Sequence, residues 1–349
     1  AEEDGASKSG ERQEGRSAAG RKTMTAVLIA GGSGRLGRAL ADRFRHDFPG
    51  LQISAPGHEA LDASDPQAVA SAVAALRPLC LFNAAGFTNV GAAQGAWDAA
   101  CRANAAAPAA LADAALASEA YFVHFSTDYV FSGVGQTPWT EADAADPLGA
   151  YGLSKRLGEE AVIARFHRGL AGVVIRAGWL YGSGDAREFP ARILTSALAG
   201  ENLWVRTDQT GKPTSYRALA ELSSRLLARR LHDAKALPQD LLHFVQPGPY
   251  VSRFELARFI LERGAWHAAV MERQEAAERL KIAAARLNGG PLAEDSEHPA
   301  NCRLDSGKLK KLMLTDCYLW EDDVDNFVEN FLVRELSTGI IPSLTSQQH

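Results

Sequence analysis

The feature that most constrains the fold is a short apolar segment that runs directly into a glycine-rich loop. Residues 26–30 read Ala-Val-Leu-Ile-Ala, and Gly31, Gly34 and Gly37 follow. An apolar run of this length that ends in glycines indicates a buried parallel strand. The glycines let backbone N–H groups at the start of the next helix approach a phosphate closely. We therefore predict a strand–loop–helix unit that binds the pyrophosphate of a dinucleotide.

Strand and helix patterns alternate through the first half of the chain. We expect strands at 51–54, 79–83, 121–126 and 172–176, and helices at 37–44, 66–76, 94–118 and 150–166. This alternation predicts an α/β fold, a Rossmann-type doubly wound parallel sheet. It also weakens the alternative that the glycines form only a tight turn.

The pattern loosens after about residue 185. We expect helices at 189–199, 215–231, 253–264 and 319–334, a strand at 242–245 and an irregular segment at 268–300. The sequence thus predicts a Rossmann domain over 24–185 and a smaller C-terminal lobe, mainly 186–336, that binds substrate and returns some segments to the core. Residues 1–23 contain no Val, Ile, Leu, Phe, Tyr or Trp, so we expect a disordered leader there, and a flexible tail at 337–349.

Composition excludes several classes of partner. The 349 residues carry a net charge of −5, with 46% apolar and 23% charged residues, so no basic field favours nucleic acid or an anionic membrane. No stretch is apolar enough to span a bilayer. The four cysteines lack CxxC spacing, which favours reduced thiols and a cytoplasmic location, and the nine histidines form no HExxH pattern. A metal site stays unknown.

A second motif indicates an acid–base group. Tyr151 and Lys155 stand four residues apart on an expected helix, so they share one face. A free tyrosine has a pKa of about 10, and we expect a nearby ammonium and an oxidised nicotinamide to lower it. Thr127 ends the preceding strand and is placed to orient a carbonyl oxygen. A chance pair on a solvated helix is the alternative, weakened because Lys155 is the only lysine between Lys22 and Lys212.

The residues expected around the adenosine leave two cofactors open. The second strand ends in Ser54-Ala-Pro-Gly-His58, without the carboxylate that usually holds the ribose of NAD. Arg35, inside the glycine loop, is expected to pair with a 2′-phosphate, with a solvated arginine as the alternative. We therefore favour NADPH and keep NADH open. Asp62 either contacts the adenine or caps the helix that begins at Pro66.

Together the motifs resemble those of the extended short-chain dehydrogenase/reductases, and within them the dTDP-4-dehydrorhamnose reductase family. The resemblance extends from about Ala26 to Leu332. The segments that carry it are Gly31–Gly37, Asn83–Val90, Ser126–Phe131, Tyr151–Lys155, Arg176–Tyr181, Asp208–Thr214 and Pro299–Asp305. Ser-Thr-Asp-Tyr-Val-Phe and Asp-Gln-x-Gly-x-Pro-Thr are specific to this branch, whereas the glycine loop is not.

The resemblance implies an NAD(P)H-dependent 4-ketoreductase that converts dTDP-4-dehydro-L-rhamnose to dTDP-L-rhamnose. The residues it assigns to catalysis are Thr127, Tyr151 and Lys155. Those it assigns to the cofactor are Gly31, Gly34, Arg35, Leu36, Gly37, Asp62, Ala63, Ala85, Gly86, Thr88, Tyr151 and Lys155. Those it assigns to the substrate are Val90, Thr127, Asp128, Tyr129 and Trp179, with a core aromatic as the alternative for Trp179. The resemblance also suggests Mg²⁺ as a cofactor, although no carboxylate cluster in the sequence identifies a site for it. It further suggests a homodimer.

The chain departs from the family pattern at two places. Thr88-Asn-Val-Gly-Ala-Ala-Gln94 replaces Thr-x-Val-Asp-x-Ala-Glu, and Gly178 stands where a serine usually precedes the tryptophan. These departures bear on the identity of the substrate sugar more than on the type of reaction.

One position in the sequence, residue 129, favours reduction over dehydration. Related dehydratases place Asp-Glu after the catalytic threonine, whereas here Asp128 is followed by Tyr129. A tyrosine cannot readily replace that second base at neutral pH.

Two further alternatives stay open. One is a non-catalytic, NADP-binding regulatory subunit that resembles the β subunit of methionine adenosyltransferase. The other is a nucleotide-sugar epimerase with tightly held NAD.

Overall fold

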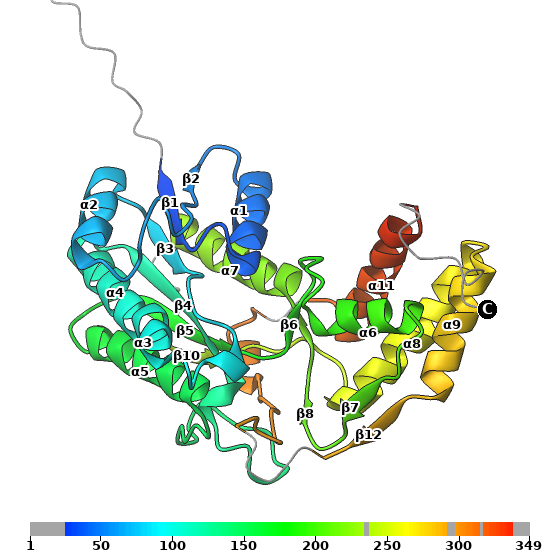
Figure 1. Ribbon diagram of the computed structural model, residues 1–349. Helices are drawn as coiled ribbons and strands as arrows, with labels where there is room; N and C mark the ends of the chain where they lie inside the picture. Colours follow the sequence, from blue (N-terminus) through cyan, green and yellow to red (C-terminus); the bar gives the residue numbers. More distant parts are fainter. Residues whose placement is uncertain (1–24, 234–236, 292–296, 315–316, 338–349) are drawn as a thin grey trace, which may run out of the picture.

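Figure 1 shows the fold, taken from a computed structural model of the chain. The structure describes residues 25–233, 237–291, 297–314 and 317–337. The leader expected at 1–23, and all but the first residue of the tail expected at 337–349, lie outside the described residues.

Six parallel strands form the central sheet, in the order β2-β1-β3-β4-β5-β10. The strands are β1 (Ala26–Ala30), β2 (Gln52–Ser54), β3 (Cys80–Asn83), β4 (Tyr121–Thr127), β5 (Gly172–Ala177) and β10 (Asp240–His243). The strand order reverses between β1 and β3, and ligands of doubly wound sheets bind at the carboxyl ends of such a pair. The predicted α/β fold is confirmed.

Helices cover both faces of this sheet (Figure 1). Alternate residues of β1 face opposite cores, because side chains alternate along a strand: Val27 and Ile29 in one, Leu28 in the other. The helices on the Val27 side are α1 (Arg35–Asp47) and α7 (Tyr216–His232), and those on the Leu28 side are α2 (Pro66–Leu76), α4 (Ala107–Ala117) and α5 (Ala150–Phe166).

A third core lies in the C-terminal lobe, which occupies the right of Figure 1. Its helices are α6 (Phe189–Leu198), α8 (Arg253–Val270), α9 (Gln274–Ala285) and α11 (Trp320–Ser337). Its short strand pairs are β7 (Trp204–Arg206) with β12 (Asn288–Gly290), and β8 (Thr210–Gly211) with β11 (Val251–Ser252). The pair β6 (Leu180–Tyr181) and β9 (Thr214–Ser215) connects this lobe to the sheet, and α7, β10 and α10 (Gly307–Lys311) return to the first domain.

The expected single helix at 94–118 is divided into three parts. The segment α3 (Trp97–Cys101) is followed by a π-helical turn, η2 (Arg102–Ala106), before α4 begins. Asn104 lies inside that turn and is fully buried. Its side-chain amide donates to Phe87 O at 3.0 Å and to Ser154 Oγ at 2.9 Å, and its carbonyl oxygen accepts from Phe87 N at 2.9 Å. The turn thus aims a polar side chain between α5 and the loop after β3.

The expectation of an irregular segment at 268–300 is wrong over most of its described length. Helix α8 continues to Val270, and α9 follows immediately. In α9, the apolar residues Ala276, Ala277 and Leu280 are buried, whereas the charged residues Glu275, Glu278 and Lys281 are exposed. The polar composition therefore reflected one solvated helix face.

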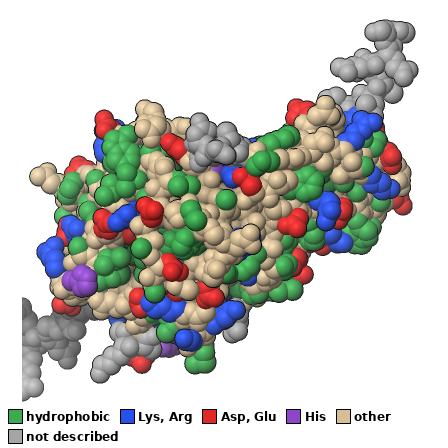
Figure 2. All heavy atoms as spheres, turned by 90° about the horizontal axis from the view of Figure 1, so that it is seen from below, with side chains coloured by type: hydrophobic (Ala, Val, Ile, Leu, Met, Phe, Trp, Pro, Cys, Tyr) green, Lys and Arg blue, Asp and Glu red, His purple; other side chains and the backbone are tan. Residues whose placement is uncertain are grey.

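The surface carries both signs of charge. On the face shown in Figure 2, Lys and Arg are interspersed with Asp and Glu, with small apolar areas between them. No helix among the described residues is long and apolar enough to cross a membrane.

Candidate active site

The loop between β1 and α1 forms a backbone cradle. Gly31 has a φ of +77°, which favours glycine, and a Cβ there would lie 2.6 Å from Ala85 N. Gly34 is the N-cap of α1, and neither a capping side chain nor an acidic residue occupies the first turn of that helix. Free N–H groups at a helix N-terminus attract anions. The loop therefore fits a pyrophosphate.

A cavity of about 570 Å³, here called the glycine-loop cavity, opens beside this cradle. The predicted cofactor residues that line it are Gly31, Gly34, Asp62, Ala63, Ala85 and Gly86. Leu36 and Gly37 line neither this cavity nor the next one: Leu36 packs in the core, and a Cβ on Gly37 would meet the Gly31 carbonyl oxygen.

Asp62 faces the glycine-loop cavity and does not cap α2. Ser64 donates to Asp62 Oδ1 from its Oγ at 2.7 Å and from its N at 2.9 Å, and these bonds lower the pKa of Asp62. The cap of α2 is Asp65, whose side chain accepts from Gln67 N and Ala68 N. The capping role considered for Asp62 is therefore wrong, and its contact with a nucleotide stays a prediction.

Arg35 does not lie where the sequence placed it. Its side chain lines a second cavity, and Arg35 Nη1 lies 3.9 Å from the buried Glu188 Oε1. The basic side chains that line the glycine-loop cavity are those of His58 and Arg102. The contact of Arg35 with a 2′-phosphate stays a prediction, and Arg35 lines the second cavity rather than the glycine-loop cavity.

The second cavity, here called the tyrosine cavity, brings the expected chemistry together. It measures about 310 Å³ and lies where β4 and β5 end and the C-terminal lobe begins. The predicted residues that line it are Arg35, Thr88, Val90, Thr127, Asp128, Tyr129, Tyr151 and Trp179. Tyr151 thus opens into a cavity that also reaches the glycine-loop helix.

Lys155 is buried behind this group. It is only 7% exposed, and its Nζ donates to Phe125 O at 2.6 Å. Burial lowers the pKa of Lys155 to about 8, against the opposing attraction of Glu159. A Cβ on Gly86 would lie 3.9 Å from Lys155 Nζ, so the ammonium lies next to the glycine-loop cavity. The alternative of a solvated Tyr–Lys pair is wrong.

The pKa of Tyr151 is shifted opposite to the expected direction. Burial raises it above the usual value, a hydrogen bond with Thr127 partly offsets this, and Asp128 raises it further. The phenol is therefore held in its protonated form, as a proton donor must be.

A buried carboxyl stands beside the threonine. Thr127 Oγ1 donates to Asp128 Oδ1 at 2.9 Å, and Asp128 Oδ2 has no hydrogen-bond partner among the described residues. Burial raises the pKa of Asp128, an effect that hydrogen bonds with Cys302 and Thr127 partly offset. A Cβ on Gly178 would lie 2.5 Å from Asp128 Oδ2. The unusual glycine thus leaves room for this carboxyl.

The wall opposite Tyr151 comes from separate segments of the lobe. Trp179 adopts a φ of +55°, rare for a non-glycine residue, and its ring faces the Arg253 guanidinium. Lining residues that the sequence did not single out include Arg187, Glu188, Phe189, Pro190, Tyr216, Arg253 and Leu256. The capping box of Ser252 and Glu255 marks the start of α8 just before Arg253, but it does not indicate that Arg253 lines a cavity.

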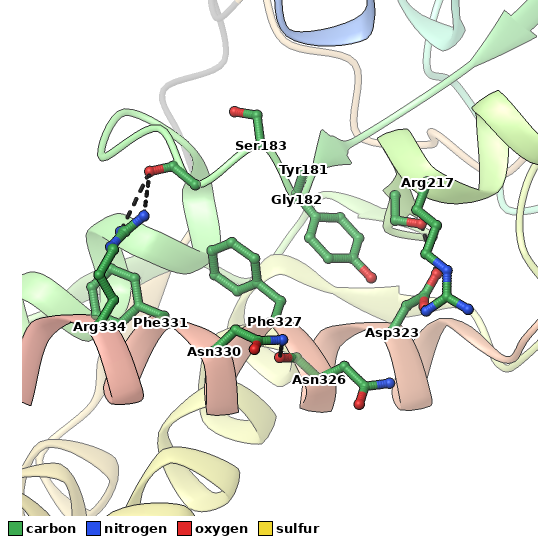
Figure 3. Close-up of a pocket in the computed structure, with 12 residues that line it drawn as sticks. Tyr181, Gly182, Ser183, Arg217, Asp323, Asn326, Phe327, Asn330, Phe331 and Arg334 are labelled. Atoms are coloured by element: carbon green, nitrogen blue, oxygen red, sulfur yellow. Dashed lines mark hydrogen bonds and ion pairs between the residues drawn. The ribbon is translucent and has the colours of Figure 1, made fainter. Parts of the chain in front are cut away.

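Figure 3 shows a third cavity, here called the outer cavity, between the 181–184 segment and α11. It measures about 310 Å³, and its side chains include Phe327 and Phe331. The guanidinium of Arg334 lies 3.5 Å from the Gly184 carbonyl oxygen, and Glu188 accepts from Gly182 N at 2.9 Å. Tyr181 lines both this cavity and the tyrosine cavity, so the 181–184 segment separates the two.

Among the described residues, no cluster of three or more His, Cys, Asp or Glu side chains could hold a metal ion.

Comparisons with known proteins agree with this geometry. Residues 24–333 match the family described as RmlD substrate binding domain. A dTDP-4-dehydrorhamnose reductase of Salmonella typhimurium is 32% identical over 255 residues, 72% of this chain and 79% of the relative. A probable dTDP-4,6-dihydroxy-2-methyloxan-3-one 4-ketoreductase of Streptomyces antibioticus is 36% identical over 206 residues, 59% of this chain and 67% of that relative.

A solved structure shows the same fold. The dTDP-4-dehydrorhamnose reductase of Bacillus anthracis, in complex with NADP, superimposes with a TM-score of 0.70 at 24% identity and covers 89% of this chain and 99% of its own. This chain belongs to the dTDP-4-dehydrorhamnose reductase family.

Proposed function

We propose that this member of the family is an NADPH-dependent reductase of the C4 ketone of a nucleotide-linked 4-keto-6-deoxyhexose. The observation that carries the proposal is the tyrosine cavity. Tyr151 and Thr127 line it together with Arg35, which belongs to the helix that follows the glycine loop. A proton donor, a carbonyl-orienting hydroxyl and a dinucleotide cradle are what reduction of a ketone requires.

NADPH is the proposed cofactor, with NADH as the weaker alternative. The relative from Bacillus anthracis was solved with NADP. Arg102 and His58 supply basic groups to the glycine-loop cavity, and a 2′-phosphate would favour both. Asp62 lines the same cavity and is proposed to contact the adenosine. We assign no step to Mg²⁺.

The proposed substrate is dTDP-4-dehydro-L-rhamnose, reduced to dTDP-L-rhamnose. The Salmonella relative bears the name of that reaction. The Streptomyces antibioticus relative is named for the 4-ketone of a different dTDP-linked sugar, which supports the reaction position more firmly than the sugar. The four cysteines show no CxxC spacing, which agrees with a reducing compartment, so we propose the cytoplasm as the site of action.

The residues divide the work of one reduction. NADPH, when held at the glycine loop, would supply the hydride for the new C–H bond at C4 and would become NADP⁺. Tyr151 donates its hydroxyl proton to the carbonyl oxygen as that bond forms, giving the alcohol. Thr127 holds the carbonyl oxygen beside that hydroxyl. Lys155 holds the cofactor ribose, and Tyr151 regains a proton from water after the product leaves.

Replacement of Tyr151 tests this proposal. We expect Tyr151→Phe to lower kcat by about 10²–10⁴-fold with little change in NADPH affinity, because only the proton donor is lost. The assay is oxidation of NADPH at 340 nm with the 4-keto sugar nucleotide. Tyr318→Phe is the matched control, because it removes the hydroxyl of a half-exposed tyrosine that lines none of the three cavities.

The alternatives have distinct outcomes. Equal rates for wild type and Tyr151→Phe would contradict the mechanism. No turnover of any keto sugar, with a synthetase that co-purifies, would instead support the regulatory subunit. NAD that stays bound through purification would support an epimerase.

A further inference from the structure

One cation in the tyrosine cavity has no role in the hydride step. Arg253 is the first residue of α8, and its guanidinium lines the cavity that holds Tyr151. Among the described residues, no carboxylate lies within ion-pair distance of it: the recorded ion pairs of the lobe involve other arginines. Arg253 is half-buried, and a cation that is partly withdrawn from water without a counter-ion is stabilised when an anion joins it.

The guanidinium is held in a fixed plane. Its carbon lies 3.7 Å from the ring centroid of Trp179 and 5.0 Å from that of Phe189. Its Nε donates to Gln209 Oε1 at 3.0 Å. Among the described residues no acceptor is bonded to the two terminal nitrogens of Arg253, which can therefore donate together, the geometry that suits phosphate oxygens.

The N-terminal end of helix α8 adds positive potential beside the Arg253 guanidinium. Helix α8 spans 18 residues and begins at Arg253, with Ser252 as its N-cap, so its positive end lies next to the guanidinium. Two carboxyl side chains line the cavity together with Arg253: burial raises the pKa of Asp128, and Glu188 lies 3.9 Å from Arg35. Arg206 does not change this charge balance, because Asp208 pairs with its guanidinium at 2.8 and 3.0 Å.

We propose that Arg253 is the subsite for the diphosphate of the sugar nucleotide, gripping it at the end of the tyrosine cavity away from the glycine loop. The proposal rests on the proposed function, because it requires a sugar nucleotide as the substrate. The nucleoside diphosphate of that substrate would extend out of the cavity on the side of α8. The cofactor's own pyrophosphate belongs to the other end, at the α1 N-terminus. Arg253 therefore positions the sugar so that its C4 ketone meets Tyr151.

The test compares two ligands that differ only in the diphosphate. Calorimetry with dTDP and with thymidine, both in the presence of NADP⁺, gives the preference of the wild-type protein for the charged ligand. We expect Arg253→Gln to reduce this preference about 10- to 100-fold, the scale of a lost charge-assisted hydrogen bond, with thymidine affinity unchanged. Arg253→Met is a second variant that keeps an apolar stem against Trp179.

Controls separate a local contact from a general loss of charge or fold. Arg258→Gln removes a cation from the exposed face of the same helix, where Arg258 pairs with Glu262, and must leave the dTDP preference intact. NADPH affinity must stay at the wild-type value in both Arg253 variants, because the glycine loop is untouched.

The outcomes distinguish this proposal from the proposed function. Wild-type dTDP preference in the Arg253 variants, while Tyr151-dependent turnover is present, would overturn the subsite and leave the reductase in place. Loss of the preference in a protein that reduces no keto sugar would support the subsite and contradict the reductase.

Discussion

The two ends of the proposed active site are built in different ways. The cofactor end is made mainly of backbone: Gly31 turns the chain with a φ of +77°, and α1 begins after Gly34 with no capping side chain. The substrate end is made of side chains, with Trp179, Phe189 and Arg253 brought together from distant segments. A backbone cradle tolerates few substitutions, whereas a wall of side chains can change residue by residue. One reaction can therefore be kept while the sugar changes.

Tyr151 and Lys155 stand at the boundary between these ends. Tyr151 opens into the tyrosine cavity, and Lys155 Nζ lies next to Gly86 of the glycine-loop cavity. Both come from the first two turns of α5, so one helix sets the spacing between the ketone and the cofactor ribose. Substitutions at Tyr151 or Lys155 should therefore affect both the cofactor end and the substrate end. Substitutions elsewhere in the site should affect only one of the two ends.

The largest stability effect is expected at Lys155. Its pKa falls from 10.5 to about 8, so the folded protein disfavours the charged form by about 3 kcal/mol. Below about pH 8 both the folded and the unfolded chain hold this proton, and the cost is fully present. Between about pH 8 and 10.5 the folded chain binds fewer protons, so stability rises with pH. Above this range the cost is gone.

Lys155→Met isolates this contribution. Relative to wild type, we expect the variant to gain stability from the removed charge at pH 7.5 and to lose that advantage by about pH 10.5. The measurement is the difference in free energy of unfolding, by urea titration at several pH values, in which other titrating groups cancel. A difference that stays constant with pH would show that the lysine is not desolvated.

The next effect is expected at the cofactor end. Gly31→Ala places a Cβ against Ala85 N in a left-handed backbone, which costs about 1–3 kcal/mol of stability and distorts the cradle. We expect NADPH affinity to fall at least tenfold while the dTDP-over-thymidine preference stays. Gly50→Ala is the control, because nothing lies within 4 Å of its added Cβ. Equal NADPH affinity in both variants would refute the cradle.

The same contrast explains what the sequence could predict. The cofactor end follows from contiguous residues, because a strand, a glycine loop and a helix start are local patterns. Thr127, Tyr151 and Lys155 were also predictable, since they end one strand and begin the next helix. The position of Arg35 was not, because the sequence cannot show which cavity a long side chain enters. The pKa of Tyr151 depends on burial, which is set by the whole fold.

The substrate end could be predicted only in part. Asp208–Thr214 and Trp179 stood out as motifs, but Glu188 and Phe189 carry no local signal of a shared wall. Their meeting depends on how the lobe packs against the sheet, which one sequence does not specify. The helix α9 was missed because its charged face concealed a short apolar stripe at Ala276, Ala277 and Leu280.

The smallest effect is expected from Gly178→Ala, at the substrate end. The added Cβ would lie 2.5 Å from Asp128 Oδ2, so the carboxyl must move, and with it the Thr127 hydroxyl bonded to Asp128 Oδ1. We expect kcat/KM for the keto sugar to fall about tenfold with NADPH affinity unchanged, since misplacing a positioning group by a fraction of an ångström costs rate.

A double-mutant cycle decides whether Asp128 transmits this effect. In an Asp128→Ala background the space beside residue 178 is open, so Gly178→Ala should add little further loss, which makes the two changes strongly non-additive. Additive losses would mean that the alanine acts through Trp179, the next residue, whose φ of +55° depends on the same turn. Backbone geometry would then constrain the substrate end as well as the cofactor end. At residues 178 and 179 the two ends would no longer differ in how they are built.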